Sequence, residues 1–274
     1  MKTTGFIQPK IEQDHYVLGG IVSLPKVIIR PDGQWVDFVP VFEPQRKAFE
    51  TFNCTGFNTL NCIEMLFKQS GLEKNFSDRF VGVLAGTNPA IGGNDPHTVA
   101  ETIRKNGNID EGMMPFADSL QTVEEFYSWS GVDEGKCVRE GKKWIQGYTF
   151  GHEWVFDGFV GNKQELIMES LKYSPLGVSV KAWEKGTDGL FRKGKGERDN
   201  HWTVIVGCVP NKYWIVNDSY LEDGQPIKHL EWDYDFGFCK RYALLKKKES
   251  TEVKCAWFSG VVSMFFNKNN LQTI

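Results

Sequence analysis

Three residues far apart in the sequence, Cys54, His201 and Asp218, are of the types that together activate a cysteine nucleophile. Cys54 stands in the segment 53–57, Asn-Cys-Thr-Gly-Phe, and a stretch with helical spacing follows at once. At a helix N-terminus, backbone N–H groups and the helix dipole favour a thiolate, and the same groups can hold an oxyanion. We therefore expect a nucleophilic thiol with a depressed pKa at residue 54, the most readily alkylated of the six cysteines.

His201 is the histidine expected to serve as the base. It follows a loop rich in glycine and charge, residues 186–200, and begins an apolar run, so it would be held rigidly while facing a cleft. Asp218 follows the next strand, and a carboxylate on the second ring nitrogen fixes the tautomer and stabilises the imidazolium. Asn217 competes for this role. Surface or core roles are expected for the other four histidines, His15, His97, His152 and His229.

The order and spacing of these residues resemble those of the papain-like cysteine peptidases. In that family the histidine and its partner lie about 130–150 residues after the cysteine; here His201 is 147 residues after Cys54 (201 − 54) and Asp218 is 17 after His201 (218 − 201). Phe57 and Glu64 match residues of the family's first helix. Further matching segments, spanning about 40–248, are 92–94, 96–107, 115–116, 175–180, 200–207 and 213–220.

The resemblance implies an α+β, two-lobed fold, with a helical lobe, an antiparallel β-barrel-like lobe and a cleft between them. It implies a thiol protease, a hydrolase that cleaves peptide bonds, with a peptide or protein as its partner and no cofactor or metal. The expected divisions are an N-terminal arm packing on the β lobe (1–40), a helical lobe (41–135), a β-rich lobe (136–250) and a C-terminal extension (251–274).

The resemblance also suggests further site residues. Gly92, Gly93 and Asn200 would bind substrate. Gln45 would donate to the oxyanion, although it stands nine residues before Cys54, where the family has its glutamine six before. Three more departures are Thr55 in place of tryptophan, Trp202 in place of a small residue after the histidine, and Asp218 in place of asparagine.

Periodicity and capping residues predict the elements around these positions. Helices are expected from residue 54, between Asp95 and Gly107, near 122–129 and near 163–173. Strands are expected at 178–182, 202–209, 213–216 and 242–245. Helices thus come first and an antiparallel sheet second, which is an α+β arrangement.

Composition excludes several other classes of protein. The 274 residues carry a net charge of −3, which does not suggest a nucleic-acid binder. No CxxC pair suggests a zinc site, no apolar leader opens the chain, and no apolar run is long enough for a membrane span. We expect a cytoplasmic protein with free thiols. The disulfide-poor pattern resembles prokaryotic and phage members of the family, so association with a phage or virion stays open, as does the oligomeric state.

Two alternative functions remain at this point. Residues 53–57 also resemble the cysteine motif of NlpC/P60 cell-wall amidopeptidases, in which His97, 43 residues after Cys54 (97 − 54), would be the base. That histidine falls on a predicted helix, whereas those enzymes carry theirs on a strand. The third hypothesis, an inactive papain-fold binding or structural module, is favoured by the displaced Gln45 and the bulky Trp202.

Overall fold

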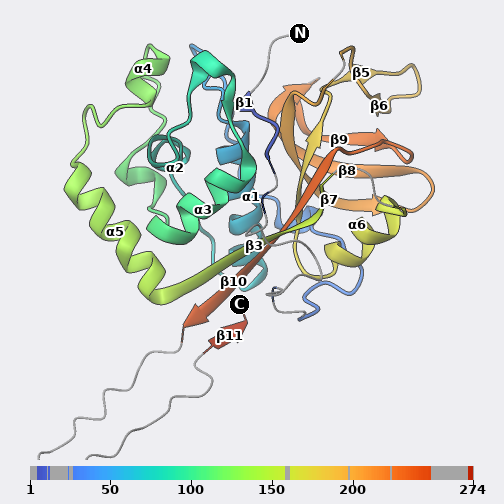
Figure 1. The fold of residues 1–274 in the computed structure, drawn as a ribbon, viewed down its shortest axis with the longest axis horizontal. Helices are drawn as coiled ribbons and strands as arrows, with labels where there is room; N and C mark the ends of the chain where they lie inside the picture. The colour runs from blue at the N-terminus through green and yellow to red at the C-terminus, as the bar shows by residue number, and fades with distance from the viewer. Residues whose placement is uncertain are drawn as a thin grey trace, which may run out of the picture.

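The chain folds into a helical lobe and a sheet lobe that meet along the first helix (Figure 1). The computed structural model describes residues 5–10, 12, 24, 27–157, 161–196, 198–222, 224–247 and 271–273. The α-helices in these residues are α1 (Cys54–Gln69), α2 (Asp78–Leu84), α3 (Pro96–Asn106), α4 (Val123–Phe126), α5 (Glu134–Gly147) and α6 (Lys163–Leu171). Short 3-10 helices are η1 (Val36–Phe38), η2 (Pro89–Ile91) and η3 (Glu111–Met113).

The strands belong to one small and one large sheet. They are β1 (Gly5–Phe6), β2 (Gly93–Asn94), β3 (Tyr148–Asp157), β4 (Leu176–Val180), β5 (Glu184–Lys185), β6 (Phe191–Arg192), β7 (His201–Val209), β8 (Tyr213–Glu222), β9 (Gln225–Glu231), β10 (Phe238–Lys247) and β11 (Leu271–Thr273). The large sheet has the order β11-β10-β4-β7-β8-β9-β6-β5, with β3 also paired to β10. Every pair in it is antiparallel except β6 with β9. The predicted α+β class, helices before sheet, is confirmed.

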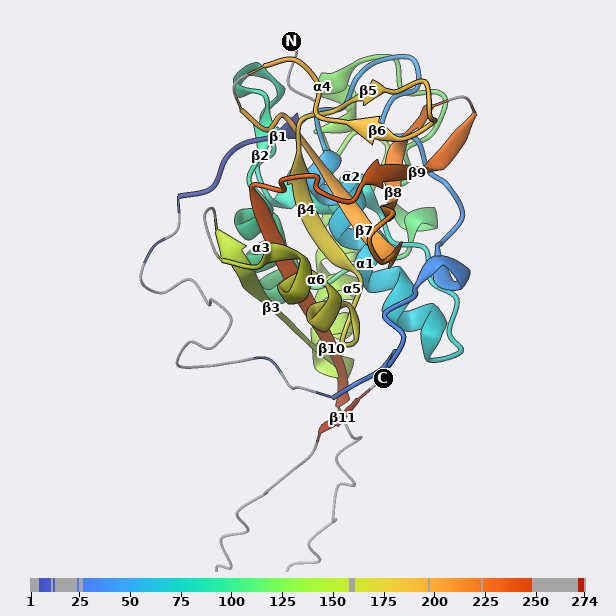
Figure 2. The same ribbon diagram turned by 90° about the vertical axis from the view of Figure 1, so that its right-hand side faces the viewer.

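Helix α1 occupies the centre of the molecule, between α2–α5 and the sheet (Figure 1). Thirteen of its side chains are buried, from Cys54 to Phe67. It packs against β7, while α6 covers another part of the sheet (Figure 2). Helix α1 begins at Cys54 and β7 begins at His201, and Asn58 Nδ2 near the start of α1 bonds the Trp202 carbonyl near the start of β7, so these two ends lie together where the lobes meet.

Several predicted caps and boundaries hold. Asp95 caps α3 by accepting from the backbone N–H groups of His97 and Thr98, and Gly107 ends the helix. Other elements were missed or underestimated. Helix α5, α2 and strands β3 and β9 were not predicted, and β10 is more than twice as long as the predicted run 242–245. The proposed lobe boundary at residue 135 would cut α5 near its start.

Two other expectations concern single features. Of the six cysteines, the five that the structure describes, Cys54, Cys62, Cys137, Cys208 and Cys239, are free thiols; Cys255 lies outside the described residues. Among the described helices, none has the length and apolar character needed to cross a membrane.

Candidate active site

Cys54 is the first residue of α1, as its sequence context predicts. The chain reaches it through Phe52, whose φ of 57° lies in the left-handed region, an unusual conformation for an aromatic residue. Asn53 occupies the N-cap position but makes no capping hydrogen bond; its Nδ2 donates instead to the carbonyl of Asp78 at 3.0 Å. The first backbone N–H groups of α1 are therefore not consumed by the Asn53 side chain, so they can serve another acceptor.

His201 and Asp218 form a fully buried pair on neighbouring strands. His201 Nε2 lies 2.5 Å from Asp218 Oδ1, and both side chains have no exposed surface. The second carboxylate oxygen, Oδ2, accepts from Lys228 Nζ at 2.9 Å, and Lys228 is equally buried. Burial alone would raise the pKa of Asp218, but His201 and Lys228 outweigh it and lower the pKa to about 2. The carboxylate is thus ionised and held between His201 and the Lys228 ammonium.

Asn58, one turn into α1, ties the nucleophile segment to the strand that carries His201. Its Nδ2 lies 3.0 Å from the carbonyl of Cys54 and 2.6 Å from that of Trp202, the residue after His201. The same nitrogen is 3.2 Å from Ser219 Oγ, next to Asp218. One buried amide therefore joins the three segments that carry the predicted triad.

The thiol of Cys54 is buried and neutral, contrary to the expected depressed pKa. Burial raises its pKa well above the usual range, and the negative charges of Asp218 and Glu50 add to the rise. A backbone hydrogen bond from Trp202 acts in the opposite direction and is outweighed. The prediction of a lowered Cys54 pKa considered only the helix N-terminus. Loss of water around the buried sulfur disfavours the thiolate more than the helix N-terminus favours it, so the pKa is raised.

The burial of Cys54 comes partly from β1, which covers it. Gly5 and Phe6 pair in parallel with Gly93 and Asn94, and Ile7 N donates to the Asn94 carbonyl at 2.9 Å. Phe6 belongs to the same buried aromatic cluster as Cys54. The two backbones approach so closely that a Cβ on Gly93 would clash with the Gly5 carbonyl.

The glycines of the predicted substrate segment thus form an edge that already binds an extended chain. Gly92, with φ 93°, ends η2, and Gly93, with φ 120°, opens β2. Both need left-handed backbone angles that side chains disfavour.

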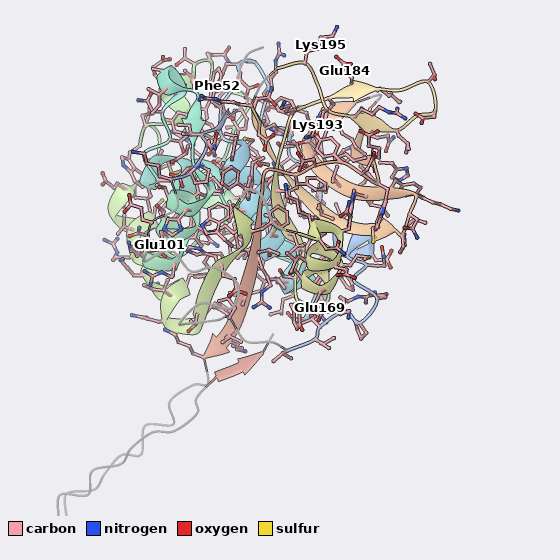
Figure 3. The ribbon with its side chains drawn as sticks, turned by 45° about the vertical axis from the view of Figure 1, so that its right-hand side comes forward. Phe52, Glu101, Glu169, Glu184, Lys193 and Lys195 are labelled. Carbon is pink, nitrogen blue, oxygen red and sulfur yellow. The ribbon has the colours of Figure 1, made fainter. Side chains whose placement is uncertain are left out.

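The site lies toward one end of the molecule. Phe52, two residues before Cys54, lies at the same end as Lys193 and Lys195 of the sheet lobe, whereas Glu101 and Glu169 lie away from that end (Figure 3).

Gln45 lies within a buried hydrogen-bond network. Its Nε2 donates to Glu50 Oε1 at 2.8 Å and contacts Tyr220 OH at 2.7 Å, while its Oε1 accepts from Ser219 Oγ at 2.6 Å. Tyr220 OH in turn donates to Glu50 Oε2. Gln45 is therefore linked to the part of β8 that carries Asp218, but its amide protons face Glu50 and Tyr220.

The remaining predicted residues support the site from its edges. Asn200 Oδ1 accepts from the Ala182 backbone N–H at 2.9 Å, and its own N–H bonds the Val180 carbonyl, which anchors the strand before His201. Asn217, the competitor of Asp218, accepts from Thr203 through its backbone carbonyl. Asp218, not Asn217, therefore faces His201.

Sequence reasoning missed four residues of this network: Lys228, Asn58, Glu50 and Tyr220. Lys228 comes from β9, a strand that was not predicted, so nothing in the sequence placed it near Asp218. Asn58 stands four residues after Cys54 in the predicted helix, and a polar residue on that buried face was a usable signal.

Among the described residues, no group of three or more His, Cys, Asp or Glu side chains could hold a metal ion.

Comparison with solved structures relates this geometry to known proteins. Xylellain, a cysteine protease from Xylella fastidiosa, superposes with a TM-score of 0.60 at 12% identity, covering 89% of this chain and 96% of that one. A digestive procathepsin L2 proteinase from the Tenebrio molitor larval midgut gives 0.58 at 15% identity, covering 88% and 78%. The bromelain protease from Ananas comosus, in complex with the E64 inhibitor, gives 0.52 at 19% identity, covering 76% and 96%.

Sequence comparison alone finds less. No family model and no curated protein sequence matches the chain. The structural likeness at these low identities concerns the fold, and it agrees with the two lobes joined along α1 and with the antiparallel sheet. We conclude that this chain has the papain-like fold.

Proposed function

We propose that this protein is a cysteine-type peptidase that hydrolyses peptide bonds through Cys54, His201 and Asp218. The observation that carries the proposal is the link, through Asn58, between the start of α1 and the strand that holds the His201–Asp218 pair. A cysteine at a helix start, a histidine and an ionised carboxylate on that histidine are the components of thiol catalysis.

In the proposed reaction, Cys54 Sγ attacks the carbonyl carbon of the scissile bond and its proton passes to His201. Asp218 accepts from Nε2 of the imidazole and stabilises the cation that forms, so Nδ1 is the nitrogen that serves the thiol. The imidazolium then returns the proton to the leaving amine, and water hydrolyses the thioester. Lys228 Nζ donates to Asp218 Oδ2, the carboxylate oxygen that does not bond His201, and so holds the carboxylate in place.

The oxyanion would be held by the backbone N–H of Cys54 and by the amide of Gln45. The Asn53 side chain does not cap α1, which supports the Cys54 backbone N–H as the first donor. For the second, Gln45 must turn one amide proton away from Glu50 or Tyr220, its present partners. Gly92 and Gly93 would bind the peptide backbone, in the way that Gly93 now pairs with Gly5 of β1, while Asn200 positions His201.

The covered thiol favours a second candidate, the inactive papain-fold module. Cys54 has no exposed surface, and Phe6 and Trp202 pack with it. The NlpC/P60 alternative gains no comparable support: His97 lies in the first turn of α3, with its ring 5.2 Å from that of His152.

Labelling with E64, the inhibitor in the bromelain complex, tests the proposal. We expect covalent modification of Cys54 in the full chain or, if β1 blocks access, in a variant lacking residues 1–9. Cys54→Ala should abolish both labelling and peptide hydrolysis, whereas Cys208→Ala serves as the matched control and should change neither. Absence of labelling and of hydrolysis in the folded, shortened variant would exclude a peptidase and favour the module.

A further inference from the structure

Four aromatic side chains form a cluster beside Cys54, and one of them belongs to the strand that covers it. Phe6 of β1 stacks on Trp202, with ring centroids 5.8 Å apart and planes 7° from parallel, and lies 6.4 Å from Phe238. Trp154 meets Trp202 edge to face at 6.4 Å. Three of the four rings are thus supplied by the sheet, and Phe6 is the one that can leave with the N-terminal segment.

The sheet side of this cluster contains buried hydrogen-bond donors without an acceptor, and two of them, on Lys240 and Trp154, lie next to each other. The Lys240 ammonium lies 3.8 Å from the centroid of the Trp154 ring and has no exposed surface. Neither Lys240 Nζ nor Trp154 Nε1 has a hydrogen-bond partner among the described residues. Buried donors are almost always paired, and an unpaired one destabilises the fold, so this pair of groups requires an explanation.

The acidic residues near Lys240 are all committed to other partners. On α3, Asp95 caps the helix and Glu101 binds Arg104, Lys105 and His152. On β3, Glu153 pairs with Arg241. Burial lowers the pKa of Lys240 to about 7, and the negative charges of Asp95, Glu101 and Glu153 only partly offset it. The buried His152, which packs against His97, also lies near Lys240, and the pKa of His152 is lowered as well, to about 3, first by burial and then by Lys240.

Phe6 and Lys240 lie against the same part of the site. Both pack on the ring system that contains Trp154, and Asp95, which acts electrostatically on Lys240, directly follows Asn94, the register partner of Phe6. Phe6 supplies apolar contact there but no acceptor. An occupant with a carboxylate would satisfy both donors, and a charge-assisted bond of this kind is stronger than a neutral one.

We propose that the aromatic cluster with Lys240 binds an acidic side chain, aspartate or glutamate, of the peptide that takes the place of Phe6. The proposal rests on the peptidase function above and names its substrate class. Trp154, Trp202 and Phe238 enclose the side chain, while Lys240 Nζ and Trp154 Nε1 donate to its carboxylate. A basic side chain is excluded because it would meet the Lys240 ammonium in a buried site.

The first test needs no peptidase activity, because residue 6 of the chain itself serves as the ligand. Phe6→Glu and Phe6→Gln are nearly equal in size and differ in charge. With Lys240 present, we expect the melting temperature of Phe6→Glu to exceed that of Phe6→Gln by about 2–4 °C at pH 6. In the Lys240→Met background the order should reverse, because the carboxylate loses its partner. Equal stability of the two variants, or the same difference in both backgrounds, overturns the proposal.

The second test measures cleavage of a peptide library by the full-length protein. Acidic residues at one substrate position should raise kcat/KM at least about tenfold over the matching amides, a usual size for one specific polar contact. Lys240→Met should remove that preference, and Lys246→Met, an exposed lysine on the same strand, should retain it. Cleavage without acidic preference refutes the inference alone. No cleavage by either the full-length protein or the variant lacking residues 1–9 refutes the peptidase, and the Phe6 variants then still decide whether the cluster binds a carboxylate.

Discussion

The buried Lys228 is the residue whose removal should reveal most about this site. Its Nζ donates to Asp218 Oδ2 at 2.9 Å and to the Tyr220 carbonyl at 2.7 Å, and neither Lys228 nor Asp218 has an exposed side chain. Lys228→Met keeps the length of the side chain and removes its charge. The substitution leaves Asp218 with His201 as its remaining side-chain partner of the pair described above.

The magnitude follows from the cost of an unpaired buried charge. Removing one partner of a buried ion pair destabilises a protein by about 3–5 kcal/mol. For a chain of this size, that corresponds to a fall in melting temperature of about 6–20 °C. The pKa of Asp218 gives a second measure: lowering it from 3.8 to about 2 represents roughly 2–3 kcal/mol of stabilisation.

The pH dependence has a definite sign. Because the folded pKa of Asp218 is below the unfolded value, its contribution to stability is complete above about pH 4 and disappears as the pH falls through about 2. Lys228→Met raises that folded pKa and removes the part of the contribution that Lys228 supplies. The stability gap between wild type and variant should therefore be widest above pH 4 and should narrow toward pH 2.

Denaturant unfolding of the full chain at several pH values measures this gap. Lys212→Met, at an exposed turn, is the matched control and should change the free energy of unfolding by less than about 0.5 kcal/mol. In an Asp218→Asn background, Lys228→Met should cost much less, since the carboxylate is gone. If Lys228→Met is no worse than Lys212→Met, or if the cost is the same with Asn at 218, the pair does not stabilise the site as argued.

Three further predictions concern other parts of the site. Phe6→Ala should raise the alkylation rate of Cys54 at neutral pH about tenfold by relieving its desolvation, as mass-spectrometric footprinting against the unchanged Cys239 would show; an unaltered rate contradicts the covering role of β1. Gln45→Ala should slow acyl transfer by about two to three orders of magnitude in steady-state kinetics, and unchanged turnover would assign the second oxyanion donor elsewhere. Burial raises the pKa of Glu111 from 4.5 to about 8, so the wild type loses stability as the pH rises through this range; Glu111→Gln should be more stable by about 4 kcal/mol at pH 8 and equal at pH 4, and a constant difference across this range would refute the effect of burial on Glu111.

Local sequence signals located the helix start and its neighbours well. Asp95, Pro96 and Gly107 bound α3 because caps and glycine stops act within a few residues. Cys54 opens α1 without a capping side chain, and its position was predicted because the apolar residues at helical spacing begin just after it. Elements with weaker patterns were missed: β9 alternates exposed and buried residues irregularly, and β3 mixes charged and aromatic side chains.

Burial, by contrast, could not be read along the chain. Whether Cys54 is a thiol or a thiolate depends on what covers it, and the covering Phe6 lies 48 residues upstream (54 − 6). The same limit applies to Lys240, whose neighbours come from β3, α3 and β1. Electrostatic effects in a protein interior depend on distance through space and on exclusion of water, neither of which a sequence pattern encodes.

The sequence by itself determined the papain-like order of elements and the pairing of His201 with Asp218, because neighbouring antiparallel strands bring residues at this spacing side by side. It did not determine the length of the second strand: Asp218 was expected just after a strand ending at residue 216, but it lies inside β8 (Tyr213–Glu222). Only the tertiary structure decided what surrounds that pair. It placed Lys228 on the carboxylate, Asn58 between helix and strand, and Phe6 over the thiol. These contacts join segments that are far apart in the sequence. How close such segments lie in space is set by side-chain packing in the folded core, which a sequence pattern does not reveal.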